Sequence, residues 1–358
     1  MSLVYFDFSD GAEPGSDDSS LESSSQPPNV TSILAAAGNE LPLLPPTNLS
    51  FDKQLGKGSS FDVNLEIYVK PADKNWNPYY VAVKHMNLGR GSRDSLRPHY
   101  AGVQNELRVL THPSLKDNDL ILPILAYGWT NSLLGERPYL VVDYSDHGTL
   151  TQYLKRINPP LCDRRELALD VAAGLKALHD VKIIHGDVKP DNILVFDTLE
   201  MSRAQMAKLA DFGGAIFELD EEQAKLYGGT ALYKAPELDR RGKFQEHNRV
   251  IATKLYAADI YSFGITLWEI MKSGRSYIEE SWLLNGETKR DFLHRIAEVD
   301  EDAVLCRART FCAQLLRGHS SDTISKVVEQ TFEITLPDDP LRRSDIDQVL
   351  DSLGQGAQ

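Results

Sequence analysis

Residues 185–192 read HGDVKPDN, and this stretch decides how the rest of the chain is interpreted. It packs a histidine, two aspartates, a lysine and an asparagine between a long amphipathic segment and the apolar run ILVF. Asp187 can accept a proton, and Lys189 can neutralise a phosphoryl group. The side chain of Asn192 offers a hard oxygen of the kind that Mg²⁺ prefers. We therefore expect a loop between a helix and a strand that carries chemistry.

Two stretches that follow this loop add to it. LADFGG places Asp211 directly after a short predicted strand, where its carboxylate is a second hard oxygen ligand for Mg²⁺. GTALYKAPEL then closes the segment at Glu237. Each of these pieces is modest by itself, and only their order and spacing together are specific.

Two stretches that precede the loop have the chemistry of a phosphate site. LGKGSSFDV sets Gly56 and Gly58 between two predicted strands, where backbone N–H groups can approach phosphate oxygens closely. A glycine turn between strands is common, so this signal alone is weak. VAVK ends on Lys84, and a lysine on a buried strand needs an anion. Glu106 on the next predicted helix is one candidate, although two unrelated surface charges would give the same pattern.

Taken together, these stretches resemble the eukaryotic protein kinases over roughly residues 50–354. The signature set of that family is a glycine-rich loop, V-A-I-K, a helix glutamate, H-R-D-x-x-x-x-N, D-F-G and A-P-E. The matching positions are Gly56 and Gly58, Val81 to Lys84, Glu106, His185 to Asn192, Asp211 to Gly213, and Ala235 to Glu237. The resemblance implies transfer of the ATP γ-phosphoryl group to a protein, and the lysine at 189 is similar to the Ser/Thr class.

The resemblance also implies a role for each catalytic group. Lys84 would hold the α- and β-phosphates of ATP and pair with Glu106. Asp187 would orient and deprotonate the acceptor hydroxyl, with Lys189 beside it. Catalysis would then consist mostly of positioning and electrostatic stabilisation of a loose transition state.

The same resemblance implies the sites for the cofactors, ATP and Mg²⁺. Asn192 and Asp211 would bind the Mg²⁺ ions. Asp143 and Ser145 would present backbone groups to the adenine. The residues expected to enclose the adenine ring are Leu55, Val63, Ala82 and Leu194.

Three further positions match supporting residues of the family. Arg343 would pair with the glutamate of A-P-E, and Asp259 would brace the catalytic loop from a buried helix. Thr230 matches the position that contacts the catalytic aspartate and lysine. We therefore expect a structural role for this threonine.

The predicted fold class is α+β, with the two lobes of a protein kinase-like fold. A disordered acidic head rich in serine and proline is expected over residues 1–50. A small β-rich N-lobe with one key helix follows over residues 51–144, and a larger helical C-lobe over 145–354. One amphipathic helix is predicted over residues 162–181, with Asp163 as its N-cap. The apolar stretch 259–274 predicts a buried helix.

Two positions depart from the family pattern. Gly186 stands where the family usually has an arginine that binds a phosphate on the activation segment. That segment contains no serine, and its only threonine is Thr230, while ELDEE at 218–222 supplies permanent negative charge. We therefore hypothesise a kinase that needs no activation-segment phosphorylation. The alternative is that the glycine is a feature of this lineage that has no role in regulation. Phe61 replaces the third glycine of the phosphate loop and is expected at the loop's aromatic tip.

Two other classes of function stay open at this point. The altered phosphate loop mildly favours a pseudokinase, a nucleotide-binding scaffold that signals by conformation, whereas the complete set of charged catalytic residues argues against it. HGD also opens the catalytic loop of small-molecule phosphotransferases similar to aminoglycoside and choline kinases. Those families generally lack the lysine two residues later and lack A-P-E, so we favour a protein substrate.

Composition limits the partners and the compartment. The net charge is −14, and half of it comes from seven acids in residues 1–50, which contain no lysine or arginine. Without a broad basic surface, nucleic acid is not expected as a partner. No apolar run approaches membrane length, and no secretory signal is apparent. Three cysteines without metal spacing predict reduced, mostly buried thiols in a cytoplasmic protein, with the nucleus as a second location.

Overall fold

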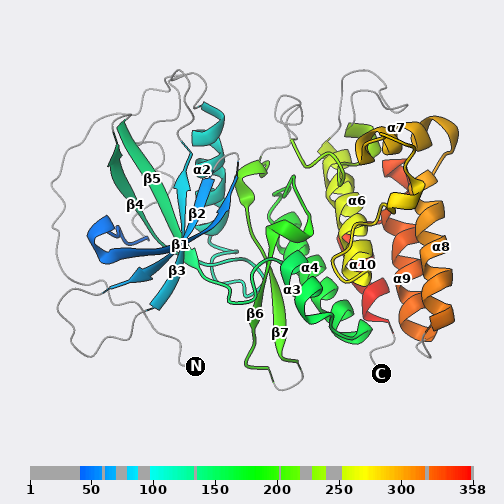
Figure 1. Ribbon diagram of the computed structural model, residues 1–358, viewed down its shortest axis with the longest axis horizontal. Helices are drawn as coiled ribbons and strands as arrows, with labels where there is room; N and C mark the ends of the chain where they lie inside the picture. The colour runs from blue at the N-terminus through cyan, green and yellow to red at the C-terminus, as the bar shows by residue number, and fades with distance from the viewer. Residues whose placement is uncertain are drawn as a thin grey trace. The chain divides into compact units, whose positions relative to one another are not determined.

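Figure 1 shows the computed structural model of the chain, which divides into two compact units. The first unit comprises Met1–Ala101 and Leu125–Val142, and the second comprises Gly102–Ile124 and Asp143–Gln358. The last boundary lies close to the predicted one after residue 144, whereas residues 102–124 group with the second unit. The structure describes residues 41–58, 61–69, 79–87, 97–132, 135–200, 203–217, 228–238, 252–318 and 322–355.

The first unit is built on a five-stranded sheet with the strand order β1-β2-β3-β5-β4. Its strands are β1 (Leu49–Lys57), β2 (Phe61–Tyr68), β3 (Tyr79–Met86), β4 (Ile124–Ser132) and β5 (Gly135–Asp143). β2 pairs antiparallel with both β1 and β3, which confirms the predicted hairpin and third strand. Valines and aromatic residues suit this half-buried pleated surface, and Val81, Val83 and Tyr139 form part of its core.

The end of the predicted disordered head is part of this unit. Residues 1–40 lie outside the described part of the chain, but Leu44 is buried and its N–H donates to the Tyr127 carbonyl of β4 at 2.8 Å. The Tyr139 hydroxyl donates to the Leu44 carbonyl at 2.5 Å. Gly128 makes room for this contact, because a Cβ there would lie 2.4 Å from the Tyr139 hydroxyl oxygen. The predicted boundary at residue 50 is therefore too late, since burial of Leu44 orders the chain before β1.

The second unit is mainly helical, as the sequence predicts, and contains one two-stranded sheet. Helix α2 (Arg97–Leu110) begins in the first unit and continues into the second. The sheet pairs β6 (Ile193–Asp197) with β7 (Gln205–Leu209). The remaining helices are α3 (Leu150–Ile157), α4 (Leu161–Asp180), α6 (Ala252–Met271), α7 (Lys289–Val299), α8 (Ala303–Gly318), α9 (Asp322–Thr335) and α10 (Ile346–Gly354).

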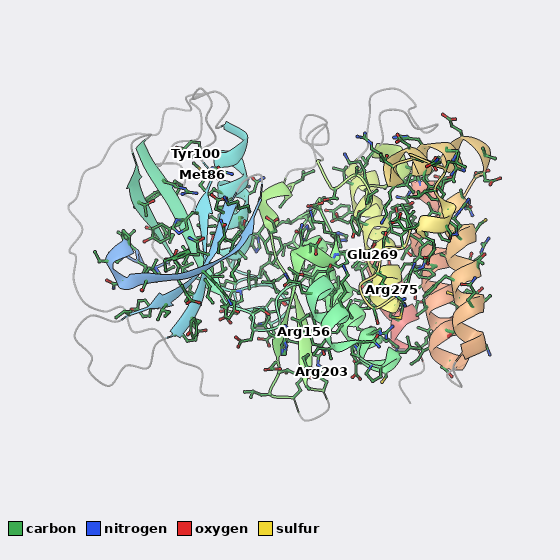
Figure 2. All side chains as sticks on the ribbon, viewed as in Figure 1. Met86, Tyr100, Arg156, Arg203, Glu269 and Arg275 are labelled. Carbon is green, nitrogen blue, oxygen red and sulfur yellow. The ribbon has the colours of Figure 1, made fainter. Side chains whose placement is uncertain are left out.

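Helices α4 and α6 form the core that positions the candidate site. The predicted apolar face of α4 is buried, and it consists of Leu167, Val171, Leu175 and Leu178. α6 is buried along most of its length, and it also carries the buried polar residues Asp259 and Glu269. Figure 2 labels Glu269 on this helix. Asp163 is not the N-cap that the sequence predicts, because α4 begins two residues earlier at Leu161 after Pro160.

Two properties of the whole chain bear on its environment. No helix among the described residues combines the length and the apolar character that crossing a bilayer requires. The three cysteines are free, as expected, but Cys162 and Cys306 are exposed and only Cys312 is buried. The prediction of mostly buried thiols is therefore wrong, because α4 and α8 turn these two positions toward solvent.

Candidate active site

The loop at residues 185–192 follows α4, and a side chain of α6 accepts hydrogen bonds from its backbone. The fully buried carboxylate of Asp259 accepts the backbone N–H of His185 at 2.8 Å and that of Gly186 at 3.0 Å. His179 of α4 lies 3.2 Å from the same carboxylate. A buried carboxylate is costly unless it is hydrogen-bonded, so these donors explain why it is tolerated there. The predicted brace by Asp259 is thus confirmed.

Asp187 lies at the centre of a polar cluster. The ammonium group of Lys189 donates to the Asp187 carboxylate at 2.6 Å and to the Thr230 hydroxyl at 2.7 Å. The Thr230 backbone N–H donates to the other Asp187 oxygen at 2.7 Å. The predicted contact of Thr230 with both Asp187 and Lys189 is confirmed. These contacts fix the orientation of the carboxylate through both of its oxygens.

The environment of Asp187 also determines its protonation state. Burial alone raises the pKa of this carboxyl, but hydrogen bonds and charges from Lys189, the Thr230 side chain and His185 outweigh the burial. The net result is a pKa below the usual value for an aspartate. Asp187 is therefore an anion at neutral pH, as a group that accepts a proton must be.

Asn192 joins the same cluster through its side-chain amide nitrogen. Its side-chain nitrogen donates to the Asp187 carbonyl at 2.8 Å and to the Asp187 carboxylate at 3.0 Å. Both amide N–H groups face Asp187, so the amide oxygen is directed elsewhere. The Asn192 carbonyl accepts the N–H of Ala210 at 2.9 Å, which places Asp211 at the same end of the β6–β7 pair. A carboxylate and an amide oxygen at one end of a hairpin fit a hard cation such as Mg²⁺.

The segment around Asp211 is tied to α2. Asp211 has a left-handed backbone, with a φ of 61°, and Phe212 behind it is fully buried against His185 at a ring distance of 5.2 Å. Asn105 of α2 donates to the Gly213 carbonyl at 3.3 Å and to that of Ala215 at 3.0 Å. The sequence does not reveal Asn105, because a single amide on a helix carries no pattern of its own.

The first unit holds the other predicted phosphate-binding residues. In the register of its sheet, Gly56 pairs with Val63, and Val63 pairs with Lys84. The ammonium group of the buried Lys84 lies 4.6 Å from the ring centroid of Phe61. Phe61 is itself buried and begins β2, so its predicted place at the loop tip is wrong. Gly58 turns the chain before it, and its N–H donates to the Phe61 carbonyl at 2.7 Å.

The predicted adenine-binding residues are divided between the two units. Leu55 is exposed on β1, and Ala82 is buried on β3. In the second unit, the Asp143 N–H donates to the Pro123 carbonyl, whereas no described residue accepts the N–H of Ser145. Leu194 lies on β6. Glu106 is buried in the second unit and Lys84 belongs to the first, so their pairing stays a prediction.

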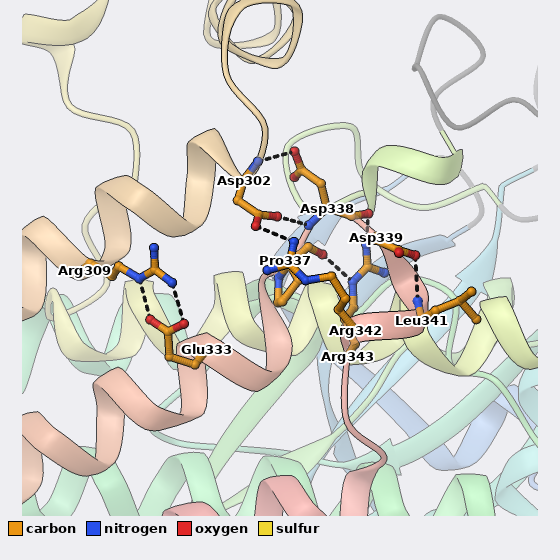
Figure 3. A network of polar contacts seen from close by, with 9 residues as sticks. All are labelled: Asp302, Arg309, Glu333, Pro337, Asp338, Asp339, Leu341, Arg342 and Arg343. Atoms are coloured by element: carbon orange, nitrogen blue, oxygen red, sulfur yellow. Dashed lines mark hydrogen bonds and ion pairs between the residues drawn. The ribbon is translucent and has the colours of Figure 1, made fainter.

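The segment that ends at Glu237 is anchored to α6 and to the loop before α10. The Tyr233 hydroxyl donates to the buried carboxylate of Glu269 at 2.7 Å. Glu237 and Arg343 form the predicted ion pair. The two terminal nitrogens of the Arg343 guanidinium donate to the two carboxylate oxygens of Glu237 at 2.7 and 2.8 Å. Figure 3 shows Arg343 beside the linked aspartates 302 and 338. The motif ELDEE and Tyr227 lie outside the described residues.

Gly186 has a conformation that a side chain would strain. Its φ is +79°, and a Cβ there would lie 2.5 Å from the Gly214 carbonyl oxygen. Gly186→Ala is expected to destabilise the second unit by about 1–3 kcal/mol, because left-handed backbone and steric contact both oppose a methyl group. Urea unfolding followed by helical circular dichroism measures this effect.

Gly286→Ala is the matched control for this substitution. Gly286 has a φ of +81°, but nothing lies within 4 Å of its would-be Cβ. It therefore reports the backbone cost alone, and we expect a smaller effect than at position 186. Equal destabilisation by the two substitutions would show that the contact with Gly214 does not constrain the loop.

Comparison with known proteins agrees with this geometry. The family model described as "Protein kinase domain" matches residues 49–352. The Pelle-like serine/threonine-protein kinase pik-1 of Caenorhabditis elegans is 35% identical over 217 residues, which cover 55% of this chain and 39% of that protein. Receptor-interacting serine/threonine-protein kinase 1 of Homo sapiens is 33% identical over 153 residues, 38% of this chain and 21% of that protein.

A third relative extends further along the chain. Proline-rich receptor-like protein kinase PERK15 of Arabidopsis thaliana is 28% identical over 263 residues, which cover 71% of this chain and 43% of that protein. The chain thus spans less than half the length of each of these three relatives.

Proposed function

Because the chain belongs to the protein kinase family, we propose that it transfers the γ-phosphoryl group of ATP to serine or threonine hydroxyls of proteins. The observation that carries this proposal is the cluster in which Asp187, held by Lys189 and Thr230, is kept ionised. Three relatives are themselves named as kinases, two of them as serine/threonine-protein kinases, which supports the choice of acceptor.

We assign the chemical roles within the second unit as follows. Asp187 accepts the hydrogen of the substrate hydroxyl and orients its oxygen toward the phosphoryl group. Lys189 neutralises negative charge that develops beside that carboxylate. Asn192 and Asp211 hold Mg²⁺, which supplies charge neutralisation at the phosphates when it is bound.

The first unit contributes the remaining contacts to ATP in this proposal. Lys84 binds the phosphates, and Gly56 and Gly58 bring backbone N–H groups to them. The N–H of Ser145 in the second unit, which no described residue accepts, supports a hydrogen bond to adenine. The other residues proposed for ATP are Leu55, Val63, Ala82, Asp143 and Leu194, with Glu106 as the partner of the lysine.

A transfer assay with radiolabelled ATP and Mg²⁺ tests this function. The substrates are a generic basic protein and the chain itself, and phosphoamino-acid analysis identifies the acceptor. Label on serine or threonine supports the proposal. Binding of ATP without transfer to any protein would instead support the pseudokinase, whose altered glycine loop ends at Phe61. Label on small alcohols but on no protein would support a small-molecule phosphotransferase.

We also propose that phosphorylation of the activation segment is not required. Gly186 has no side chain to bind a phosphate there. Within the described part of that segment, the Thr230 hydroxyl accepts from Lys189 and the Tyr233 hydroxyl donates to Glu269. Both are therefore engaged in holding the segment. Tyr227 is the remaining hydroxyl of the segment.

Complete dephosphorylation is therefore expected to change the rate of phosphoryl transfer by less than about twofold, because Gly186 stands in place of the arginine that would bind the phosphate. Mass spectrometry confirms the absence of phosphate, and Tyr227→Phe serves as the matched variant. A large loss of activity that rephosphorylation of the segment restores would contradict this expectation.

The setting of this activity is a proposal as well. We propose a protein substrate and a cytoplasmic signalling role, which suits three free cysteines. Fractionation of cells that express the full chain tests the location. Recovery in the membrane fraction would refute it.

A further inference from the structure

A cavity of about 1130 Å³ opens on the second unit at a place that the proposed function does not use. Its wall combines the connection between α3 and α4, the first turn of α4, the turn after α6, and parts of α8 and α9. No residue of the candidate active site lines it. Figure 2 labels Arg275, which stands in the turn after α6 and belongs to this wall.

Two arginines in this wall have no acidic partner. Arg164 is half-buried, and its guanidinium donates to neutral oxygens only, those of Pro159 (2.7 Å), Met271 (2.7 Å) and Asn158 (3.0 Å). The exposed Arg275 donates from Nε to the Lys272 carbonyl at 3.1 Å, which leaves the far end of its fork to solvent. Among the described residues, neither guanidinium forms an ion pair. Burial, and the charge of Arg275, lower the pKa of Arg164.

The acids of the same wall do not balance these charges. Glu279 is paired with Lys272, and Glu280 lies 3.2 Å from Lys289. Asp163 is not part of the wall; it is exposed in the first turn of α4 and accepts the Cys162 thiol at 3.3 Å. The two arginines therefore leave an excess of positive charge inside a concave surface, where an anion gains more than it would on an open face.

Apolar side chains form another part of the wall and determine what kind of anion fits. Leu161 and Ile278 are buried, and Phe311 and Ile324 line the cavity from α8 and α9. Guanidinium groups bind phosphate through paired N–H donors, and apolar walls hold hydrocarbon. We propose that this cavity binds a phosphate monoester with an apolar substituent, its phosphate at Arg164 and Arg275.

The chain supplies its own probe for this site. Cys162 lines the cavity and is exposed, whereas Cys306 is exposed on α8 outside the wall. Phenyl phosphate is expected to slow alkylation of Cys162 by neutral iodoacetamide and to leave Cys306 unchanged. Mass spectrometry of the two peptides from one sample gives both rates. This readout involves no phosphoryl transfer, so it is independent of the proposed kinase activity.

Arg275→Gln is expected to raise the phenyl phosphate concentration for half-protection by about tenfold or more, because it removes a charged donor. Arg290→Gln on α7 makes the same charge change outside the wall and is expected to have no effect. Inorganic phosphate should protect more weakly than phenyl phosphate, since it leaves the apolar wall unfilled. The proposal fails if phenyl phosphate does not protect Cys162, or if phenol protects it equally well. It also fails if phenyl phosphate protects Cys162 of the Arg275→Gln variant at the same concentration as in the chain without the substitution.

Discussion

Replacing Asp187 by asparagine is expected to lower the rate of phosphoryl transfer by about a thousandfold, the typical contribution of a positioned general base. The substitution keeps the shape of the side chain but removes the charge that Lys189 and the Thr230 N–H now share. The amide cannot accept the hydroxyl hydrogen as a carboxylate does. Single-turnover transfer from radiolabelled ATP to a basic protein measures the effect, with ATP affinity determined in parallel.

Asp191→Asn provides the control for this experiment. Asp191 belongs to the same loop, but its side chain is exposed. The same chemical change there is expected to alter transfer only slightly. If Asp187→Asn retained most of the activity while ATP affinity and folding were unchanged, Asp187 would not be the base. The chemistry would then have to rest on positioning alone.

The loop at residues 185–192 is the part of the candidate site whose geometry the sequence predicts best. Its residues lie within eight positions, and the chain around it must turn sharply between α4 and β6. The supporting contacts of Asp259, Thr230 and Arg343 are also predicted correctly, but only through the resemblance. Nothing in their local sequence indicates that a residue 74 positions away donates its N–H to Asp259.

Two of the errors have a common physical cause. Phe61 and Leu44 each occur in a stretch whose local pattern suits the predicted state. Their actual exposure depends on residues from distant strands or helices, such as Lys84 against the Phe61 ring and Tyr139 over Leu44. Tertiary contacts override local preference at such positions, and one sequence without structure does not reveal those contacts.

Arg343→Met is expected to destabilise the second unit by about 3–5 kcal/mol, because it leaves the buried carboxylate of Glu237 without its partner. The two side chains are 0% and 2% exposed, and the guanidinium also donates to the carbonyls of Pro337, Asp338 and Ala257. Urea unfolding of the purified chain, followed by helical circular dichroism, gives the change in the free energy of unfolding.

Arg309→Met separates the effect of burial from that of geometry. Arg309 and Glu333 form an ion pair with the same two-bond geometry (Figure 3), but the side chains are 45% and 38% exposed. Its loss is expected to cost no more than about 1 kcal/mol, since exposed ion pairs contribute little. Equal costs for the two substitutions would mean that burial does not decide the strength of the pair at Arg343. A larger cost at Arg343 would explain why Glu237 can hold the end of the segment that presents Thr230 to Asp187.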